Sequence, residues 1–493
     1  MDPSKKNYKI IQYRSTSILA IVFMLLLNSV VFTPSVDAES NQNHMDTAKI
    51  DQFMESAMER LNIPGASLGI VKGDQAVYLK GYGISGPDKS PVTSQTPFVL
   101  GSTSKSITAT AIMQLVEEGK IHLETPVQHY LPWFQLADKE ASSKITVKHL
   151  LHQTSGIFTR DGRVSLTKGN KSIEEHIRSL HKTQLTKPVG SEYQYSNLNY
   201  DILSGIVQAI SGQSYEQYVR TNIFDPLDMK HSYTSPNDAA KGGLATGYQP
   251  VFGYMTPTKQ LNHKGTIASG YLISSTEDMS NFLISQMNRG YFKDKSILSE
   301  ESMKQMHQPS SSAVDGPSYA MGWSVNDNVI FHDGATENTY SFMAMDGEYG
   351  YVLLVNAMDY LVSYESLIAG VRGIVHGEEL TQDDVPSAMN TYLVADLIAL
   401  VALVFVIYSI YRLFKRRDKV RITGSRVFIQ VLLMLVFYFT LPIAVLIYMS
   451  TIAPWPVIEL FLPGLGHLLF TLSILLLIIG GTKTILLIRS RVT

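Results

Sequence analysis

A serine and a lysine stand three residues apart where a strongly apolar segment begins. Ser102 is followed by Lys105, and the apolar stretch Ile107–Val116 starts two residues later. In a helix, positions i and i+3 lie on one face, so these two side chains would be neighbours. A helix N-terminus favours an alkoxide-like oxygen, and a desolvated lysine can lose its proton and act as a base. The pair therefore indicates a serine nucleophile activated by lysine.

The same spacing occurs a second time in the chain, in Ser165-Leu166-Thr167-Lys168. Gly169 and Asn170 follow directly, and no apolar helix is predicted behind them. A nucleophile at a helix N-terminus needs that helix, so the spacing alone carries little weight here. We therefore interpret this second serine–lysine pair as part of a surface loop.

A tyrosine and an asparagine form the second candidate motif, Tyr195-Ser196-Asn197, just before the helix-like stretch Tyr200–Ile210. A tyrosine held beside a lysine can serve as a phenolate-type general base, and an asparagine amide can hydrogen-bond a substrate carbonyl. Taken in isolation, the motif fits an aromatic cap packed under a helix better than it fits a catalytic group.

The third candidate is His332-Asp333-Gly334, at the end of the predicted strand Val329–His332. A cationic or hydrogen-bonding residue followed by a spacer and a glycine lets a substrate dock along the strand edge. The backbone N–H of Ala335, paired with that of Ser102, would then form an oxyanion hole worth roughly a few kcal/mol in the transition state. A single His-x-Gly has almost no weight alone.

Together the three motifs follow the order described for β-lactamases and penicillin-binding proteins. Over roughly residues 47–375 the chain resembles the penicillin-recognising serine hydrolases, especially the branch of class C β-lactamases and D-alanyl-D-alanine carboxypeptidases. Three further stretches also match, and we interpret them as scaffold: 145–156, 224–229 and 269–272.

The resemblance implies roles for the motif residues. Ser102 would form an acyl-enzyme, with proton transfer shared by Lys105 and Tyr195. Asn197 and His332 would orient the substrate, beside Gly334, and the N–H groups of Ser102 and Ala335 would bind the oxyanion. Neither a metal nor another cofactor is required. Relatives often have lysine where His332 stands, which weakens the case for a true β-lactamase.

The local patterns predict an α+β fold for this region. Strands are expected near both of its ends, so one antiparallel sheet would be assembled from N- and C-terminal parts, flanked by helices and joined to a mainly helical insertion. The predicted elements are a helix over 47–63 and strands over 66–71, 76–82, 329–332, 340–345 and 351–355.

Both ends of the chain carry membrane signals. Residues 1–38 combine an N-terminal cluster of lysines and arginine, an apolar core over 18–32 and the exit Val36-Asp37-Ala38, which is typical of a secretory signal peptide. An uncleaved anchor is the alternative. Near the other end, the segments 393–411, 427–449 and 460–479 are each long and apolar enough to cross a bilayer as helices.

Positive charge sets the expected orientation of these helices. Basic residues lie between the first two segments and after the third, whereas none lies between the second and third. Positive residues stay on the cytoplasmic side. We therefore expect a multi-pass protein of the cell membrane, with an extracytoplasmic catalytic domain over 39–375, a polar linker over 376–391, a membrane domain over 392–493 and a cytoplasmic C-terminus. The helices would be a plain anchor, unless Asp396 or His467 marks a further role.

Composition narrows the function classes. The net charge of −2 argues against a nucleic-acid partner. The chain has no cysteine, which excludes a thiol nucleophile, a disulfide scaffold and a cysteine-ligated metal. The expected partners are the lipid bilayer and a small peptide or acyl-ester substrate.

Several functions remain open at this level. The leading prediction is hydrolysis of D-amino-acid-containing peptides or esters of the cell envelope. The alternatives are a D-amino peptidase that matures an exported acylated prodrug, and a β-lactamase. In another class, a catalytically silent penicillin-binding sensor would keep the fold without the reaction.

Overall fold

We call the described residues up to 378 the main body. One eight-stranded antiparallel sheet joins the N-terminal and C-terminal parts of this main body. The computed structural model describes residues 45–167, 169–312, 316–378, 385–415 and 426–492, and the predicted signal peptide lies outside them. The strands, in spatial order, are β2 (Gln75–Gly83), β1 (Gly65–Lys72), β14 (Tyr349–Val355), β13 (Tyr340–Asp346), β12 (Val329–Ala335), β11 (Ser324–Asn326), β10 (Ser318–Tyr319) and β9 (Ser311–Ser312). The predicted sheet is confirmed.

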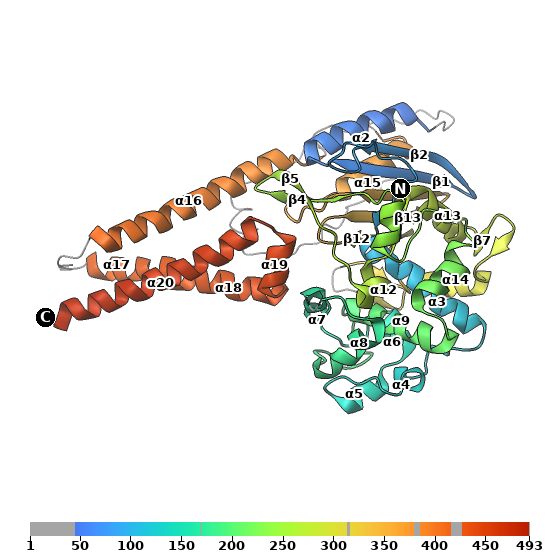
Figure 1. Cartoon of the computed structure of the whole chain (residues 1–493), viewed down its shortest axis with the longest axis horizontal. Helices are drawn as coiled ribbons and strands as arrows, with labels where there is room; N and C mark the ends of the chain where they lie inside the picture. The colour runs from blue at the N-terminus through green and yellow to red at the C-terminus, as the bar shows by residue number, and fades with distance from the viewer. Residues whose placement is uncertain (1–44, 168, 313–315, 379–384, 416–425, 493) are drawn as a thin grey trace, which may run out of the picture.

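Helices cover both faces of this sheet (Figure 1). In β14, Val352 and Leu354 pack with α3 (Ser104–Glu117) and α13 (Thr276–Met287), whereas Tyr351 and Leu353 pack in a second core. Neighbouring strand residues point to opposite faces, so an apolar strand feeds two cores at once. The second core is closed by α2 (Thr47–Leu61) and α15 (Glu365–Val375).

The segment between β2 and β9 is mainly helical, as predicted. Its principal helix is α9 (Asn197–Ser211), which packs against α3 in the first core. Besides α3 and α13, the other α-helices of this segment are α4 (Val127–Tyr130), α5 (Lys139–Lys144), α6 (Val147–Leu151), α7 (Thr159–Val164), α8 (Ile173–Arg178), α10 (Tyr215–Val219), α11 (Pro236–Lys241), α12 (Ile267–Gly270) and α14 (Glu300–His307). Short strand pairs are β3 (Phe98–Val99) with β6 (Ile273–Ser274), β4 (Gly247–Val251) with β5 (Tyr254–Thr258), and β7 (Tyr291–Phe292) with β8 (Lys295–Ser296).

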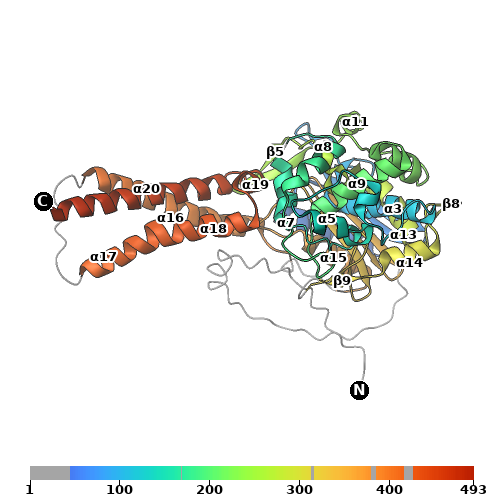
Figure 2. The ribbon, with the colours of Figure 1, turned by 90° about the horizontal axis from the view of Figure 1, so that it is seen from below.

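Three long apolar helices project from the main body as a bundle (Figures 1 and 2). The spans long and apolar enough to cross a membrane are Ala388–Lys415, Phe428–Ile452 and Leu465–Ile488. The first and third are α16 (Ala388–Lys415) and α20 (Leu465–Val492), and the second combines α17 (Arg426–Leu435), the π-helical turn η7 (Val436–Thr440) and α18 (Leu441–Ile452). The prediction of three C-terminal helices is confirmed. The charged segment 416–425 lies outside the described residues.

A polar contact ties the three helices of this membrane bundle together. The Tyr438 hydroxyl lies 2.6 Å from Ser409 Oγ and accepts a hydrogen bond of 2.5 Å from Lys483 Nζ. Each residue comes from a different span. Because polar groups in hydrocarbon need partners, this contact favours one packing arrangement of the bundle.

A short helix, α19 (Trp455–Phe461), lies in the connection between the second and third spans. Pro456 lies in its first turn, where a missing N–H has no cost, and Val457 and Ile458 are buried. We call residues 450–465, which include α19, the α19 connection.

Candidate active site

Ser102 lies in a tight turn that leads into α3. The turn is the 3₁₀ segment η1 (Gly101–Thr103), so the serine precedes the α-helix instead of occupying its first turn. Gly101 has a φ of 56°, and a Cβ there would lie 2.6 Å from the backbone nitrogen of Ala335. Only glycine fits such a conformation and such an approach. Thr103 Oγ1 donates to the Leu100 carbonyl at 2.8 Å and holds the turn.

Strand β12 passes directly behind this turn. A Cβ on Gly334 would lie 2.2 Å from the Leu100 oxygen and 2.8 Å from the Ser102 nitrogen. The two glycines thus let the serine turn and β12 approach each other closely. Ser102 and Ala335 line the same pocket. Two backbone N–H groups brought together beside a nucleophile are the elements of an oxyanion hole.

Lys105 is fully buried and has three polar neighbours. Its Nζ lies 2.9 Å from Ser102 Oγ, 2.9 Å from Asn197 Oδ1 and 2.6 Å from the Ser269 carbonyl oxygen. The last two atoms can only accept hydrogen bonds, whereas the serine hydroxyl can donate. A neutral amine, with two N–H groups and one lone pair, satisfies this set completely. Burial lowers the pKa of Lys105 to about 7, while Asp201 and Asp333 oppose that shift.

The segment that carries Tyr195 and Asn197 is held by a buried glutamine. Gln153 Oε1 accepts hydrogen bonds from the Ser196 backbone N–H at 2.9 Å and from Asn199 Nδ2 at 2.5 Å. Gln153 belongs to the stretch 145–156, which we had interpreted as scaffold. This stretch therefore has a specific role, because Gln153 binds the backbone before Asn197 and the Asn199 side chain after it.

Tyr195 stands over the lysine, with its ring centroid 4.9 Å from Lys105 Nζ. Burial raises the pKa of Tyr195 well above its ordinary value, and the neighbouring Tyr319 adds to this, although a hydrogen bond with Ser102 opposes it. The phenol is therefore neutral near pH 7. It can relay a proton as an O–H group, whereas the phenolate role considered from the sequence does not fit this environment.

His332 is enclosed by protein, with 3% of its surface exposed. Nδ1 lies 2.6 Å from the Asp333 carbonyl oxygen, which can only accept, so Nδ1 carries the proton. Nε2 then accepts from the Tyr319 hydroxyl at 3.2 Å. Burial lowers the pKa of His332 to about 4. The side chain is thus neutral near pH 7, and it supplies no cation for a substrate carboxylate.

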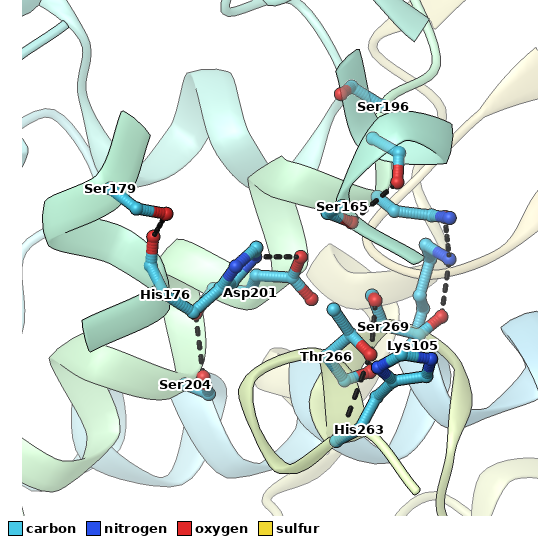
Figure 3. Close-up of polar contacts among 12 residues, drawn as sticks. Lys105, Ser165, His176, Ser179, Ser196, Asp201, Ser204, His263, Thr266 and Ser269 are labelled. Carbon is cyan, nitrogen blue, oxygen red and sulfur yellow. Dashed lines mark hydrogen bonds and ion pairs between the residues drawn. The ribbon is translucent and has the colours of Figure 1, made fainter. Parts of the chain in front are cut away.

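A polar cluster supports the lysine from below (Figure 3). The carbonyl that holds Lys105 belongs to Ser269, whose Oγ donates to the Thr266 carbonyl at 3.1 Å. Farther along, His176 and Asp201 form a buried pair with 3.0 Å between Nε2 and Oδ2. Sequence reasoning missed Ser269 as a functional residue. A carbonyl carries no side-chain signature, so only its place in the matching stretch 269–272 pointed to it.

Two residues that the sequence did not assign to the active site line the pocket in front of Ser102. Ser165, from the second serine–lysine pair, is 3% exposed and lines this pocket, so its interpretation as a surface loop was wrong. Its Oγ donates to the Gly162 carbonyl at 2.6 Å, and Lys168 lies outside the described residues. Phe461 of α19 also lines the pocket. The lining residues are Ser102, Ser165, Leu166, Asn197, Thr266, Ser269, Gly270, Tyr271, Ala335, Thr336 and Phe461.

Comparison with known proteins gives this geometry a family context. The family model described as Beta-lactamase matches residues 50–371. Protein flp of Staphylococcus aureus (strain MW2) is 33% identical over 319 residues, which are 62% of this chain and 62% of that relative. The match thus spans about three fifths of the length of such curated relatives.

Two solved structures share the fold. The octameric penicillin-binding protein homologue from Pyrococcus abyssi superposes with a TM-score of 0.59 and 27% identity, covering 68% of this chain and 78% of the homologue. A class C β-lactamase mutant superposes with a TM-score of 0.58 and 18% identity, covering 68% of this chain and 99% of the mutant. The second likeness concerns the fold alone.

Proposed function

The chain belongs to the Beta-lactamase family, and from that premise we propose that it is an active membrane-anchored serine hydrolase. It would act through an acyl-serine intermediate on D-amino-acid-containing peptides or esters of the cell envelope. The observation that carries the proposal is the contact of 2.9 Å between Lys105 Nζ and Ser102 Oγ. With a pKa of about 7, the lysine is a base matched to neutral pH.

Acylation follows from the contacts of the buried lysine. Neutral Lys105 takes the proton of the Ser102 hydroxyl as Oγ attacks the acyl carbon. The N–H groups of Ser102 and Ala335 stabilise the resulting oxyanion. The carbonyl then re-forms, the bond to the leaving nitrogen or oxygen breaks, and the proton passes through the Tyr195 hydroxyl to the leaving group.

Deacylation repeats these steps with water as the nucleophile. Lys105, neutral again, accepts a proton from the water through Tyr195 while the water oxygen attacks the ester carbon. The second oxyanion collapses, the carbon–Oγ bond breaks, and Ser102 recovers its proton. Asn197 holds Lys105 through Oδ1 in the free enzyme, and we propose that its amide Nδ2 donates to the substrate.

We place the catalytic domain outside the cell. Arg412 and Lys415 end α16 at the tip of the membrane bundle that points away from the main body (Figure 1). Positive residues favour the cytoplasmic side of a membrane, which supports an extracytoplasmic main body. The predicted signal peptide supports the same orientation.

A neutral His332 disfavours the β-lactamase alternative. The pocket lining contains no acidic or basic side chain among the described residues, so no cation there selects for the carboxylate of a β-lactam drug. We therefore expect penicillins to label Ser102 slowly and to be poor turnover substrates. Peptides and esters with blocked ends are the better first substrate panel.

Covalent labelling tests the proposal. The full chain, solubilised in detergent, is treated with a fluorescent penicillin and separately with a fluorophosphonate probe, and labelled protein is detected by mass. Ser102→Ala should abolish labelling by both probes. Ser165→Ala is the matched control, because it removes the other serine of a Ser-x-x-Lys pair in the same pocket. Loss of labelling in Ser165→Ala instead of Ser102→Ala would identify Ser165 as the nucleophile. If the wild type is not labelled by either probe, the catalytically silent sensor is favoured.

A further inference from the structure

The membrane bundle is fastened to the main body beside the active site. Arg160 Nε donates to the Ser450 carbonyl at 3.0 Å, and Arg163 Nη1 donates to the Ile452 carbonyl at 2.7 Å. Both carbonyls belong to the end of α18, where helix carbonyls lack partners within the helix. Cationic side chains at a helix C-terminus also interact favourably with its dipole. Both views show α7, which carries the arginines, next to α19 (Figures 1 and 2).

The second half of the α19 connection contacts two parts of the main body, strand β4 and the segment after β14. Gln249 Nε2 donates to the Leu460 carbonyl at 2.7 Å. The rings of Phe461 and Tyr360 lie with their centroids 5.3 Å apart. The Tyr360 hydroxyl in turn donates to the Thr336 carbonyl at 3.1 Å, and Thr336 directly follows Ala335 on the chain. Phe461 is thereby held against the strand end that supplies the oxyanion N–H.

Helix α7 links this attachment to the catalytic segment. Thr159 Oγ1 donates to the Tyr195 carbonyl at 2.5 Å. A Cβ on Gly162 would lie 3.0 Å from the Asn197 nitrogen, so α7 lies close against that segment. One short helix therefore touches Tyr195 and Asn197 on one side and the end of a membrane span on the other.

We infer that Phe461 of the α19 connection forms one wall of the active site, and that the substrate is an amphiphile whose hydrocarbon chain runs past this ring into the bilayer. The inference rests on the proposed function, and it names the substrate class of that same site. Phe461 and Ser102 line one pocket, although 359 positions separate them, and no charged side chain lines that pocket among the described residues. Most of the lining residues carry hydroxyl or amide groups, which suit the polar acyl group, whereas Leu166 and Phe461 are the large apolar side chains that a hydrocarbon chain would contact.

The position of the pocket fits a substrate resident in the membrane. Phe461 lies between the end of the second span at Ile452 and the start of the third at Leu465. Trp455, in the same short helix, is the kind of residue that sits at headgroup level. A scissile ester or amide at this depth reaches Ser102 while its hydrocarbon chain stays in the bilayer.

The first experiment tests whether the enzyme takes its substrate from the bilayer, by diluting the substrate within the membrane. The full chain is reconstituted into vesicles of phosphatidylethanolamine and phosphatidylglycerol that contain a p-nitrophenyl ester of a long-chain fatty acid. The amount of lipid is then changed at constant bulk ester concentration. We expect the rate to follow the mole fraction of ester in the bilayer. A rate that depends only on the bulk concentration, as for a soluble substrate, would overturn the inference.

The second experiment tests the aromatic wall. Phe461→Ala should lower the ratio of kcat/KM for the long-chain ester to that for p-nitrophenyl acetate about tenfold, because the chain loses its apolar contact. Trp455→Ala is the matched control: it removes an aromatic from the same helix that packs on Phe470 and does not line the pocket. We expect this control to keep the wild-type ratio.

A second variant at position 461 keeps the test decisive if Phe461→Ala does not fold. Phe461→Trp keeps an aromatic wall and narrows the pocket, so it should shift the preference to shorter chains. An unchanged ratio in both Phe461 variants would overturn the inference. Fluorophosphonate labelling of Ser102 in the same wild-type samples separates the two proposals, because labelled protein with no chain-length dependence contradicts only this inference. Unlabelled wild type contradicts the proposed function.

Discussion

Lys105 Nζ lies 2.9 Å from Oδ1 of Asn197, although 92 positions separate the two residues in the chain. The contact joins the start of α3 to the start of α9, and it brings two of the three motifs into one hydrogen-bonded group. It also leaves the lysine without a carboxylate in contact, since its other two partners are Ser102 Oγ and the Ser269 carbonyl. Burial without a paired anion lowers the pKa of a lysine, and the pH dependence of the reaction should report this.

The first prediction concerns that pH dependence. Lys105 acts as a base only when neutral, so acylation should be slow below its pKa of about 7, rise through that value and level off above it. Asp333, whose side chain is exposed, raises the pKa of Lys105. Asp333→Asn should therefore move the acid limb to lower pH by roughly 0.3 units, a small shift because water screens an exposed charge.

The labelling rate of Ser102 by a fluorophosphonate, measured from pH 5 to 9, would check this. High salt should shrink the difference between Asp333→Asn and the wild type, because it screens the same charge. An acid limb that moves to higher pH in the variant would contradict the assignment of Lys105 as the base.

The second prediction concerns the turn that carries the nucleophile. Gly101→Ala should cost at least 100-fold in the labelling rate, because a Cβ would lie 2.6 Å from the Ala335 nitrogen and push the two oxyanion donors apart. Gly119→Ala is the control: Gly119 also has a positive φ, of 68°, but a Cβ there meets nothing within 4 Å. In the control, the free energy of unfolding should fall by only about 1–3 kcal/mol, because alanine is strained at a positive φ.

Melting temperatures of both glycine variants in detergent, together with their labelling rates, separate strain from the close contact. Equal losses of activity in Gly101→Ala and Gly119→Ala would show that positive φ alone matters, and would remove the argument for a close approach of β12.

The third prediction concerns His332, which we regard as a positioning residue. His332→Ala removes one hydrogen-bond partner of the Tyr319 hydroxyl and a ring beside Tyr195, whose centroid lies 6.4 Å from that of His332. We expect kcat to fall about tenfold, because the proton-relaying Tyr195 loses a side chain that positions it, and KM to change little. A large rise in KM with an unchanged kcat would instead indicate direct contact with the substrate.

Much of the fold could be predicted because its signals are local. The apolar spacing in 47–63 and the mostly apolar run in 340–345 depend on neighbouring residues, and both elements appear as α2 and β13 with nearly the predicted bounds. The three membrane spans follow from hydropathy and length. The short helix α19 was missed, since its few apolar residues become helical against neighbours that lie far away in the sequence.

The amino-acid sequence by itself determined which groups could react, since the Ser102–Lys105 spacing and the order of the motifs need no tertiary information. Only the tertiary structure decided how these groups behave. Burial favours the neutral forms of His332 and Lys105. Ser165 is buried, and Phe461 from the α19 connection lines the same pocket as Ser102. The physical reason is that desolvation and pocket shape depend on all the atoms around a group, and most of these come from distant parts of the chain.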